Sequence, residues 1–379
     1  MTDSTAAPEL KHIFDEARML HLAQATANVS SHFDAERFLH LTTQGLDALS
    51  LMQRLRRVTE ALHATLPPAP YRQRLDVLRA LAPAINHRFV TLVLPDYVAT
   101  HGLDDFDASM DALRFFTPFG SSEFGVRPFL RHDLARALPW LTAWTRDADA
   151  HVRRLASEGS RPRLPWSFRL DALVADPAPT RPLLEALRAD DSLYVRKSVA
   201  NHLNDIAKDH PAWLLAQLGH WHAGLDGQGD GAQHTRWILR HGLRTLVKQG
   251  NTQALALLGA GAAPRVTVRE ARVEPARLVL GQHLSLAFTL ASAAAPGTPA
   301  QRLVVGYAIR YARPSGKAAR KVFKLKTLDL AAGETVTLAR RQPIRDFSTR
   351  THHAGWHGVE LLVNGQTLAE GGFELVRAG

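Results

Sequence analysis

Apolar and polar residues follow two different periods along this chain, and the period changes near residue 260. Before that point apolar positions recur every three to four residues or so, the spacing of amphipathic helices. Beyond it, stretches such as RLVLGQHLSLAFTLAS and WHGVELLVNGQTLAEGGFELV alternate residue by residue, which is typical of strands. The joint between the two patterns is GAGAAPR, at 259–265. We therefore predict a helical domain over residues 1–260 and an all-β domain over residues 265–379.

The helical pattern falls into segments that loops rich in proline or small residues separate. Its apolar stripes predict helices within residues 9–66 and over Tyr71–Leu81, 88–98 and 107–116. Asp34 is placed to cap the helix that begins at Ala35, because a short acidic side chain accepts a bond from the first-turn amides.

A sequence repeat marks the second half of the helical region. DADAHVRRLASEG from Asp147 and DSLYVRKSVANHL from Asp191 align, and Val152 and Val195 take the same place in the two segments. A degenerate third unit begins at His234. Helical pairs that recur every 40 to 47 residues or so are the mark of HEAT-like solenoids, which leave a concave surface. The alternative is a coincidental similarity of amphipathic helices.

The last part of the chain contains short alternating segments between turn residues. Asn364-Gly365 is a strong signal of a tight hairpin. About seven such strands predict an immunoglobulin-like sandwich. The predicted fold class is thus a mainly α HEAT-like repeat solenoid followed by an all-β immunoglobulin-like sandwich.

One carboxylate stands out on the helix predicted after Asp191. On a wheel of about 100° per residue, the core stripe consists of Val195, Val199, His202, Leu203 and Ile206. Another side carries Tyr194, Lys197, Asn201, Asp205 and Lys208. Asp191 is placed as the N-cap, and Pro211 predicts the stop. By spacing alone, Asp205 is either a solvated surface acid or the working acid of an enzyme.

Two further positions are candidates for function. Glu123 lies in a loop of small residues, FTPFGSSEFGVRPF, where functional groups concentrate, although it could equally cap a helix. Trp166 follows Pro165 in the segment between the repeats. Basic residues around an aromatic side chain suit a phosphate backbone with a planar group to stack, whereas simple packing is the alternative. The surrounding cations are Arg161, Arg163 and Arg169.

Composition and charge narrow the classes of function. The chain has no cysteine, which excludes disulfides, thiolate catalysis and cysteine-based zinc sites. Its net charge is +10, and from Arg265 onward there are 17 Lys/Arg against 8 Asp/Glu. A basic module beside a nearly neutral one indicates a polyanionic partner, nucleic acid first, with solubility as the alternative. The histidines lack metal-ligand spacing, so we expect no metal. The N-terminus has no secretory pattern and no apolar run reaches membrane length, so cytoplasm is expected.

The combined pattern resembles the AlkC family of alkylpurine DNA glycosylases, which is related to the AlkD glycosylases with HEAT-like repeats. The residues that carry the resemblance are YVRKSVANHLNDIAKDHPAWLLAQL, FTPFGSSEFGVRPF, RLPWSF and LVKQGNTQALALLG. The match covers the helical region, and the sandwich resembles the immunoglobulin-like domain of one AlkC subgroup.

The resemblance implies excision of 3-methyladenine and other N3- or N1-methylated bases from duplex DNA without full extrusion of the base. Carried over by position, Asp205 is the catalytic carboxylate, Glu123 the second acid and Trp166 the aromatic wall. The chemistry agrees, because a cationic base is already a good leaving group and needs negative charge and an oriented water rather than a proton donor.

The partner that we expect is duplex DNA containing alkylated bases, bound by a monomer without any cofactor. The expected DNA contacts are Arg161, Arg163, Arg169, Lys197, Asn201, Lys208, Arg240, Arg244, Lys248, Lys317, Arg320 and Lys321. Through this binding the protein would associate with the nucleoid. The alternative hypothesis is a HEAT-repeat scaffold that binds DNA or protein without chemistry.

Overall fold

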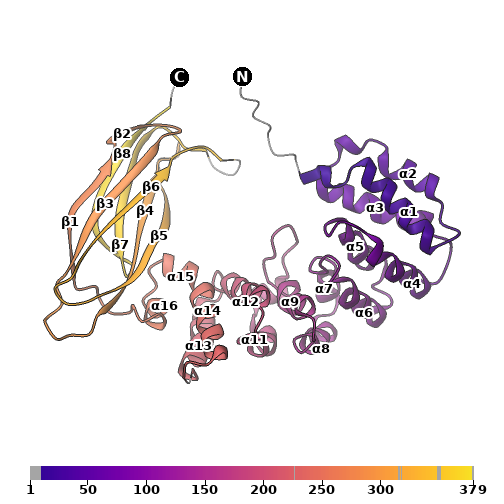
Figure 1. The fold of residues 1–379 in the computed structure, drawn as a ribbon, viewed down its shortest axis with the longest axis horizontal. Coiled ribbons are helices and arrows are strands. Elements are labelled where there is room, and N and C mark those ends of the chain that lie inside the picture. Colours follow the sequence, from indigo (N-terminus) through magenta and orange to yellow (C-terminus); the bar gives the residue numbers. More distant parts are fainter. Residues whose placement is uncertain (1–9, 226, 315, 317, 348–350, 378–379) are drawn as a thin grey trace. The chain divides into compact units, whose positions relative to one another are not determined.

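The computed structural model describes residues 10–225, 227–314, 316, 318–347 and 351–377, with helices first along the chain and strands after them (Figure 1). The helices up to residue 210 are α1 Glu16–Val29, α2 Ala35–Thr43, α3 Leu51–Thr65, α4 Tyr71–Leu81, α5 Val93–His101, α6 Phe106–Phe116, α7 Arg127–His132, α8 Leu134–Trp144, α9 Ala150–Gly159, α10 Asp171–Ala175, α11 Arg181–Leu187 and α12 Leu193–Ile206. Then follow α13 Pro211–Ala223, α14 Asp230–Gly242, α15 Arg244–Lys248 and α16 Thr252–Leu257. Asp34 caps α2 through a bond from the Arg37 amide, as its position predicts.

The arginine that follows the valine in each sequence repeat has the same structural role in both. In α9, Arg153 donates to the backbone carbonyls of Asp147 and Ala148, just before the helix. In α12, Arg196 makes the same pair of bonds to the carbonyls of Asp190 and Asp191. The arginine after the valine therefore fastens each helix to the turn that precedes it. This confirms that the two segments are structural repeats, and α9 and α12 pack against each other.

Helix α12 follows the predicted stripe, with one correction at its start. Val195, Val199, His202, Leu203 and Ile206 are all buried. The N-cap position is taken by Ser192 rather than by Asp191. Arg153 draws the Asp191 carboxylate away to an ion pair at 3.0 Å, so this acid connects neighbouring repeats. The helix ends at Ile206, and α13 begins at Pro211, as the proline predicts.

The strands form two sheets within the described residues. Their bounds are β1 Val266–Glu274, β2 Arg277–Val279, β3 His283–Ser292, β4 Gln301–Tyr311, β5 Ala319–Leu330, β6 Thr335–Pro343, β7 Gly355–Val363 and β8 Gln366–Val376. The orders are β1-β3-β6 and β2-β8-β7-β4-β5, antiparallel except for β2 with β8. Asn364-Gly365 forms the β7–β8 turn with both residues at positive φ, which confirms the predicted hairpin. Apolar side chains between the sheets, among them Phe288, Ile309 and Phe373, make the core.

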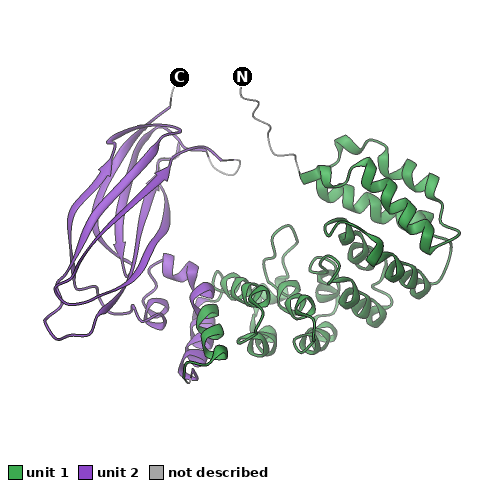
Figure 2. Ribbon diagram, viewed as in Figure 1, with its two compact units in different colours: residues 1–210, 226–238 green, residues 211–225, 239–379 purple. Residues whose placement is uncertain are grey.

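The chain divides into two compact units that do not follow the change from helix to strand (Figure 2). One contains residues 1–210 and 226–238, and the other contains residues 211–225 and 239–379. The predicted domain boundary at 260–265 does separate helices from strands. However, the last helices pack with the sandwich: Gly250 approaches Gly365 closely, and the Asn364 side chain donates to the Ala262 carbonyl. None of the helices among the described residues is long and apolar enough to cross a membrane.

Replacing Arg196 by methionine should lower the free energy of unfolding by about 1–3 kcal/mol, because two carbonyls lose their bond to a charged donor. Urea titrations followed by far-ultraviolet circular dichroism measure the loss. Arg188→Met is the control, since the partly exposed Arg188 side chain bonds an acid three residues earlier, Glu185, at 3.5 Å. Equal effects of the two changes would show that the repeat signature has no structural role.

Candidate functional site

A cleft in the first unit brings two predicted site residues together. Glu123, from the turn before α7, and Trp166, from the loop after α9, both line it. Glu158, near the end of α9, is a second carboxylate in the same lining. The other lining residues are His87, Arg88, Phe89, Leu92, Gly120, Ser121, Phe124, Arg161, Leu164 and Pro165. The cleft thus combines acids, arginines and aromatic rings.

Each acid of the cleft is held by an arginine and a hydroxyl group. Glu123 accepts hydrogen bonds from Arg154 and from the Ser121 hydroxyl. Glu158 accepts from Arg161 Nη1 at 2.7 Å and from the Ser198 hydroxyl of α12 at 2.6 Å. Bonds of this kind are stronger than neutral ones and fix the direction in which a carboxylate presents its charge.

Asp205 is buried, which rules out the solvated helix face that its spacing left open. Only 2% of the residue is exposed. Its Oδ2 atom accepts from Arg161 Nε at 2.8 Å, and its Oδ1 atom accepts from Lys208 Nζ at 2.9 Å. The segment after α9 supplies Arg161 to this side of α12, a neighbour that the wheel of a single helix omits. Because Arg161 also holds Glu158, it connects Asp205 to the lining of the cleft.

Arg161 therefore has a different role from the phosphate contact that we expected. It is buried and bonds two carboxylates at once. Burial by itself lowers the pKa of Arg161, but the Glu158 and Asp205 carboxylates outweigh it and leave the pKa raised. The same balance raises the pKa of Arg154 beside Glu123 and Glu158. Both arginines remain cations, so each acid of the site lies next to a positively charged guanidinium group.

Hydrogen bonds from Arg127 fix the backbone of the loop that carries Trp166. The Arg127 side chain is fully buried at the start of α7 and donates to the carbonyls of Gly159, Arg161 and Phe168. Burial, with Arg161 nearby, lowers the pKa of Arg127 to about 10. In this loop Trp166 is 66% exposed and has a φ of 64°. This left-handed backbone conformation is unfavourable for any residue other than glycine. A strained, exposed tryptophan in a cleft is typical of a residue kept for function.

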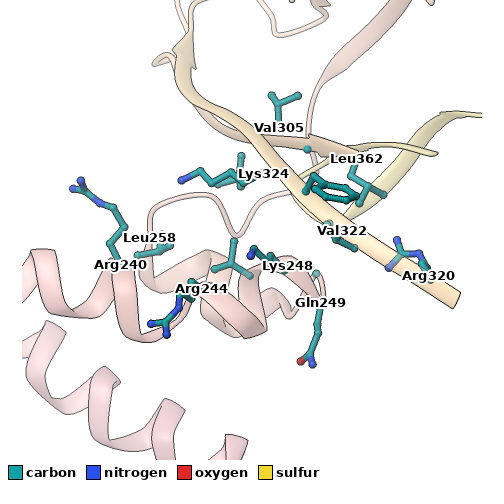
Figure 3. A pocket seen from close by; sticks show the side chains of 16 residues that line it. Arg240, Arg244, Lys248, Gln249, Leu258, Val305, Arg320, Val322, Lys324 and Leu362 are labelled. Carbon is teal, nitrogen blue, oxygen red and sulfur yellow. The ribbon is translucent and has the colours of Figure 1, made fainter. Parts of the chain in front are cut away.

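The structure distributes the remaining predicted DNA contacts over both units. In the first unit Arg169, Lys197 and Lys208 are exposed, Asn201 is half-buried, and Arg163 makes a two-bond ion pair with Asp209 at 2.7 Å. In the second unit Arg240, Arg244, Lys248 and Arg320 line one cleft (Figure 3), and Lys321 is exposed beside it on β5. Lys317 lies outside the described residues.

Sequence reasoning missed Glu158, Arg154 and Ser198. Arg154 and Glu158 are four residues apart on α9, and Glu158 and Ser198 face each other across the α9–α12 contact. The spacing of Arg154, Glu158 and Arg161 is that of one helix face, so an alternating charge row was the available signal. Tyr194 belongs to the same surface, because the Arg154 guanidinium lies 4.8 Å from its ring centroid.

Within the part of the chain that the structure describes, no three histidine or acidic side chains converge as metal ligands would. The charged side chains in and next to the first-unit cleft pair with one another: Glu123 with Arg154, and Arg161 with both Glu158 and Asp205.

Comparisons with known proteins agree on both parts of the chain. The family model described as "Uncharacterised protein YhaZ, C-terminal Ig-like domain" matches residues 267–377. Uncharacterized protein YhaZ of Bacillus subtilis (strain 168) is 39% identical over 359 residues, which are 94% of this chain and 97% of the relative. Among solved structures, Pseudomonas fluorescens alkylpurine DNA glycosylase AlkC, bound to DNA containing an abasic site analog, is 52% identical. It superimposes with a TM-score of 0.90 over 97% of this chain and 100% of its own.

The α9–α12 contact that carries the site should weaken in acid because of His202. This side chain is fully buried, and its Nδ1 atom donates to the Ser157 carbonyl. Burial lowers the pKa of His202 to about 4, and the nearby Asp205 carboxylate offsets only part of this effect. Because the buried imidazole of the folded state binds a proton less readily than that of the unfolded state, the free energy of unfolding is greatest above pH 6.5, the unfolded pKa. It decreases as the pH falls from there toward 4. Between pH 7 and pH 4.5 the loss should be about 2–3 kcal/mol.

Hydrogen exchange of the α9 and α12 amides measures this loss. His202→Gln, which does not titrate, should remove most of the pH dependence whatever its absolute stability. A slope unchanged by the substitution would contradict the assignment.

Proposed function

This chain belongs to the AlkC family of alkylpurine DNA glycosylases, and we propose that it hydrolyses the N-glycosidic bond of cationic alkylated bases in duplex DNA. Its substrates are 3-methyladenine and related N-methylated bases, and the reaction starts base excision repair. The observation that carries the proposal is the group of carboxylates held by Arg154 and Arg161 next to the exposed Trp166. The reaction is a monofunctional hydrolysis.

The chemistry of the leaving group explains why the site contains carboxylates bonded to arginine and serine rather than a proton donor. An N3-alkylated adenine carries a positive charge and departs as a neutral base, so it needs no proton from the protein. The deoxyribose left behind develops oxocarbenium character, and negative charge near it lowers the barrier. Carboxylates that accept bonds from arginine and serine are oriented before substrate arrives, which removes the cost of arranging them during the reaction.

Asp205 and Glu158 divide this work through Arg161. The Oδ1 atom of Asp205 faces Lys208, whose side chain is 45% exposed and can turn into solvent. A cationic sugar can then take the place of the ammonium group next to Asp205. Glu158 and Glu123 face the cleft, where either carboxylate can orient the attacking water. The cations that remain, Arg154 and Arg161, keep the three acids from repelling one another.

Trp166 offers a flat apolar face to the damaged base pair in this cleft. An aromatic face attracts a cationic base through its quadrupole, and it stacks on any base. Because 66% of the residue is exposed, Trp166 stands as a wall rather than as the lining of a closed pocket. This arrangement supports handling of the lesion without full extrusion of the base from the helix.

DNA binding is proposed to rest on the exposed cations of each unit, which contact phosphates and carry no sequence information. In the first unit these are Arg169, Lys197 and Lys208, with the partly exposed Arg163 as a further contact. The protein acts as a monomer in the cytoplasm and reaches the nucleoid through its affinity for DNA.

Asp205→Asn should reduce the single-turnover rate of 3-methyladenine release at least about 100-fold, the usual loss when one preorganised electrostatic group is removed. The amide keeps the shape of the side chain and can still accept from Arg161. Affinity for a duplex with an abasic-site analogue should therefore stay within about threefold of the wild type. Asp209→Asn is the matched control, an acid one turn later whose carboxylate forms an exposed ion pair with Arg163, and its release rate should match the wild type.

The alternative function, a DNA- or protein-binding scaffold without chemistry, has a distinct outcome in the same assay. A scaffold releases no methylated base even as the wild-type protein. Release that persists unchanged in Asp205→Asn would instead keep the activity and move it to Glu158 or Glu123, which Gln substitutions separate.

Trp166→Ala should lower the apparent affinity for lesion-containing duplex about 5- to 150-fold, since one base–aromatic contact contributes about 1–3 kcal/mol. Stability should change little, because the ring is mostly exposed. Trp356→Ala is the control: Trp356 is 60% exposed on β7 of the sandwich, and its loss should leave release unchanged. Titration of each variant into a fixed concentration of lesion-containing DNA, with base release as the signal, measures its apparent affinity and its release rate.

A further inference from the structure

Arg154 is the cation that two acids of the first-unit cleft share. Its guanidinium donates to Glu123 and to the Ser121 hydroxyl. Its Nη2 atom also lies 3.5 Å from Glu158 Oε1. Among the described residues, Arg154 is the one cation that forms an ion pair with Glu123. The direction in which Glu123 presents its charge therefore depends on how the guanidinium of Arg154 is held.

The aromatic ring of Tyr194 supports the face of this guanidinium. Tyr194 belongs to the first turn of α12, and Arg154 Cζ lies over its ring, 4.8 Å from the centroid. An arginine that stacks on a ring keeps its N–H groups, which point outward in the guanidinium plane, free for carboxylates. Burial raises the pKa of Tyr194, so the phenol is neutral and contacts Arg154 through its ring rather than as an anion.

The ring of Tyr194 is itself packed against the equivalent residue of the preceding repeat. His151 and Tyr194 directly precede Val152 and Val195, which take the same place in the two repeats. Their rings meet edge to face, with centroids 5.2 Å apart and an interplanar angle of 66°. Because His151 and Arg154 are three residues apart on α9, the ring from α12 contacts both. Burial lowers the pKa of His151, which keeps it neutral beside the guanidinium at neutral pH.

We propose that Tyr194 is a positioning residue of the glycosylase, whose ring holds the guanidinium of Arg154 in the orientation that directs Glu123 into the cleft. The effect on catalysis rests on the proposed function, whereas the contact between ring and guanidinium does not. Without the ring the guanidinium is free to rotate. Glu158 would keep its bond from Arg161, so the loss falls mainly on Glu123.

Two substitutions at position 194 separate the ring from the hydroxyl group. Tyr194→Leu should lower the single-turnover rate of 3-methyladenine release about 5- to 30-fold at saturating protein, as expected for the loss of one partly buried cation–π contact. Tyr194→Phe keeps the ring and should restore the rate to within about twofold of the wild type. Affinity for a duplex with an abasic-site analogue should stay within about threefold in both, because the ring acts through Arg154.

Phe115→Leu is the matched control for the loss of an exposed ring beside an arginine. Phe115 of α6 is 38% exposed, and Tyr194 is 40% exposed. Arg79 Cζ lies 6.0 Å from the Phe115 centroid, and Arg79 pairs with Asp76 and Asp111. None of these residues lines the first-unit cleft. The release rate of Phe115→Leu should therefore match the wild type.

Nuclear magnetic resonance of the full chain tests the contact without any reaction. The Nε–Hε signal of Arg154 is assigned as the signal that Arg154→Lys lacks. The ring current of residue 194 should shift this signal upfield in the wild type and in Tyr194→Phe, and Tyr194→Leu should lose the shift. Circular dichroism confirms that the variants fold.

The outcomes that overturn the proposal differ from those that contradict the proposed function. Normal release by Tyr194→Leu at saturating protein overturns the positioning role. Weaker duplex binding with an unchanged release rate overturns it in favour of a direct DNA contact, and slow release by Tyr194→Phe overturns it in favour of the hydroxyl group. Absence of release by the wild type contradicts the proposed function instead, and the Arg154 signal then decides whether the ring holds the guanidinium.

Discussion

The buried guanidinium of Arg161 is the interaction on which the site depends. It bonds Glu158 of its own repeat and Asp205 of the next, and so fastens α9 to α12 at the point where the acids gather. Removing three charged groups from water is costly, and a buried ion pair often gives little net stability. What it does supply is geometry, because each group has its remaining bonds satisfied in only one arrangement. Ser198 on Glu158 and Lys208 on Asp205 complete that arrangement.

A second buried arginine supports the first one. Arg127 donates to three carbonyls of the segment 159–168, so the path of the backbone that carries Arg161 and Trp166 is set from α7. The strained φ of Trp166 persists because the segment on either side of it is held in this way. Acids, guanidinium groups and indole are thus positioned by one connected set of bonds within the first unit. A change at Arg127, which is itself outside the lining of the cleft, would therefore alter the positions of all of them.

The parts of the structure that depend on local pattern could be predicted from the sequence, and the parts that depend on neighbours could not. The stripe of α12, the bounds of α4 and the turn at Asn364-Gly365 follow from periodicity and turn chemistry alone. The burial of Asp205 depends on a segment 44 residues earlier, and no wheel includes it. For the same reason the local pattern does not identify Glu158 as a site residue, because its partner Ser198 lies 40 residues later in the chain. The packing of the last helices with the sandwich was likewise invisible, because it rests on contacts such as Asn364 with Ala262.

The way the acids are held also bears on which bases the proposed enzyme can remove. Glu123, Glu158 and Asp205 each accept hydrogen bonds from a cation, so they are arranged to supply charge and not to donate protons. A neutral base leaves readily only when it is protonated, whereas a methylated cationic base leaves without help. Discrimination would then arise at the bond-breaking step, from the charge of the base itself, and an open cleft would suffice. A site of this design gains selectivity without a closed pocket, and this is consistent with a tryptophan that remains mostly exposed at its edge.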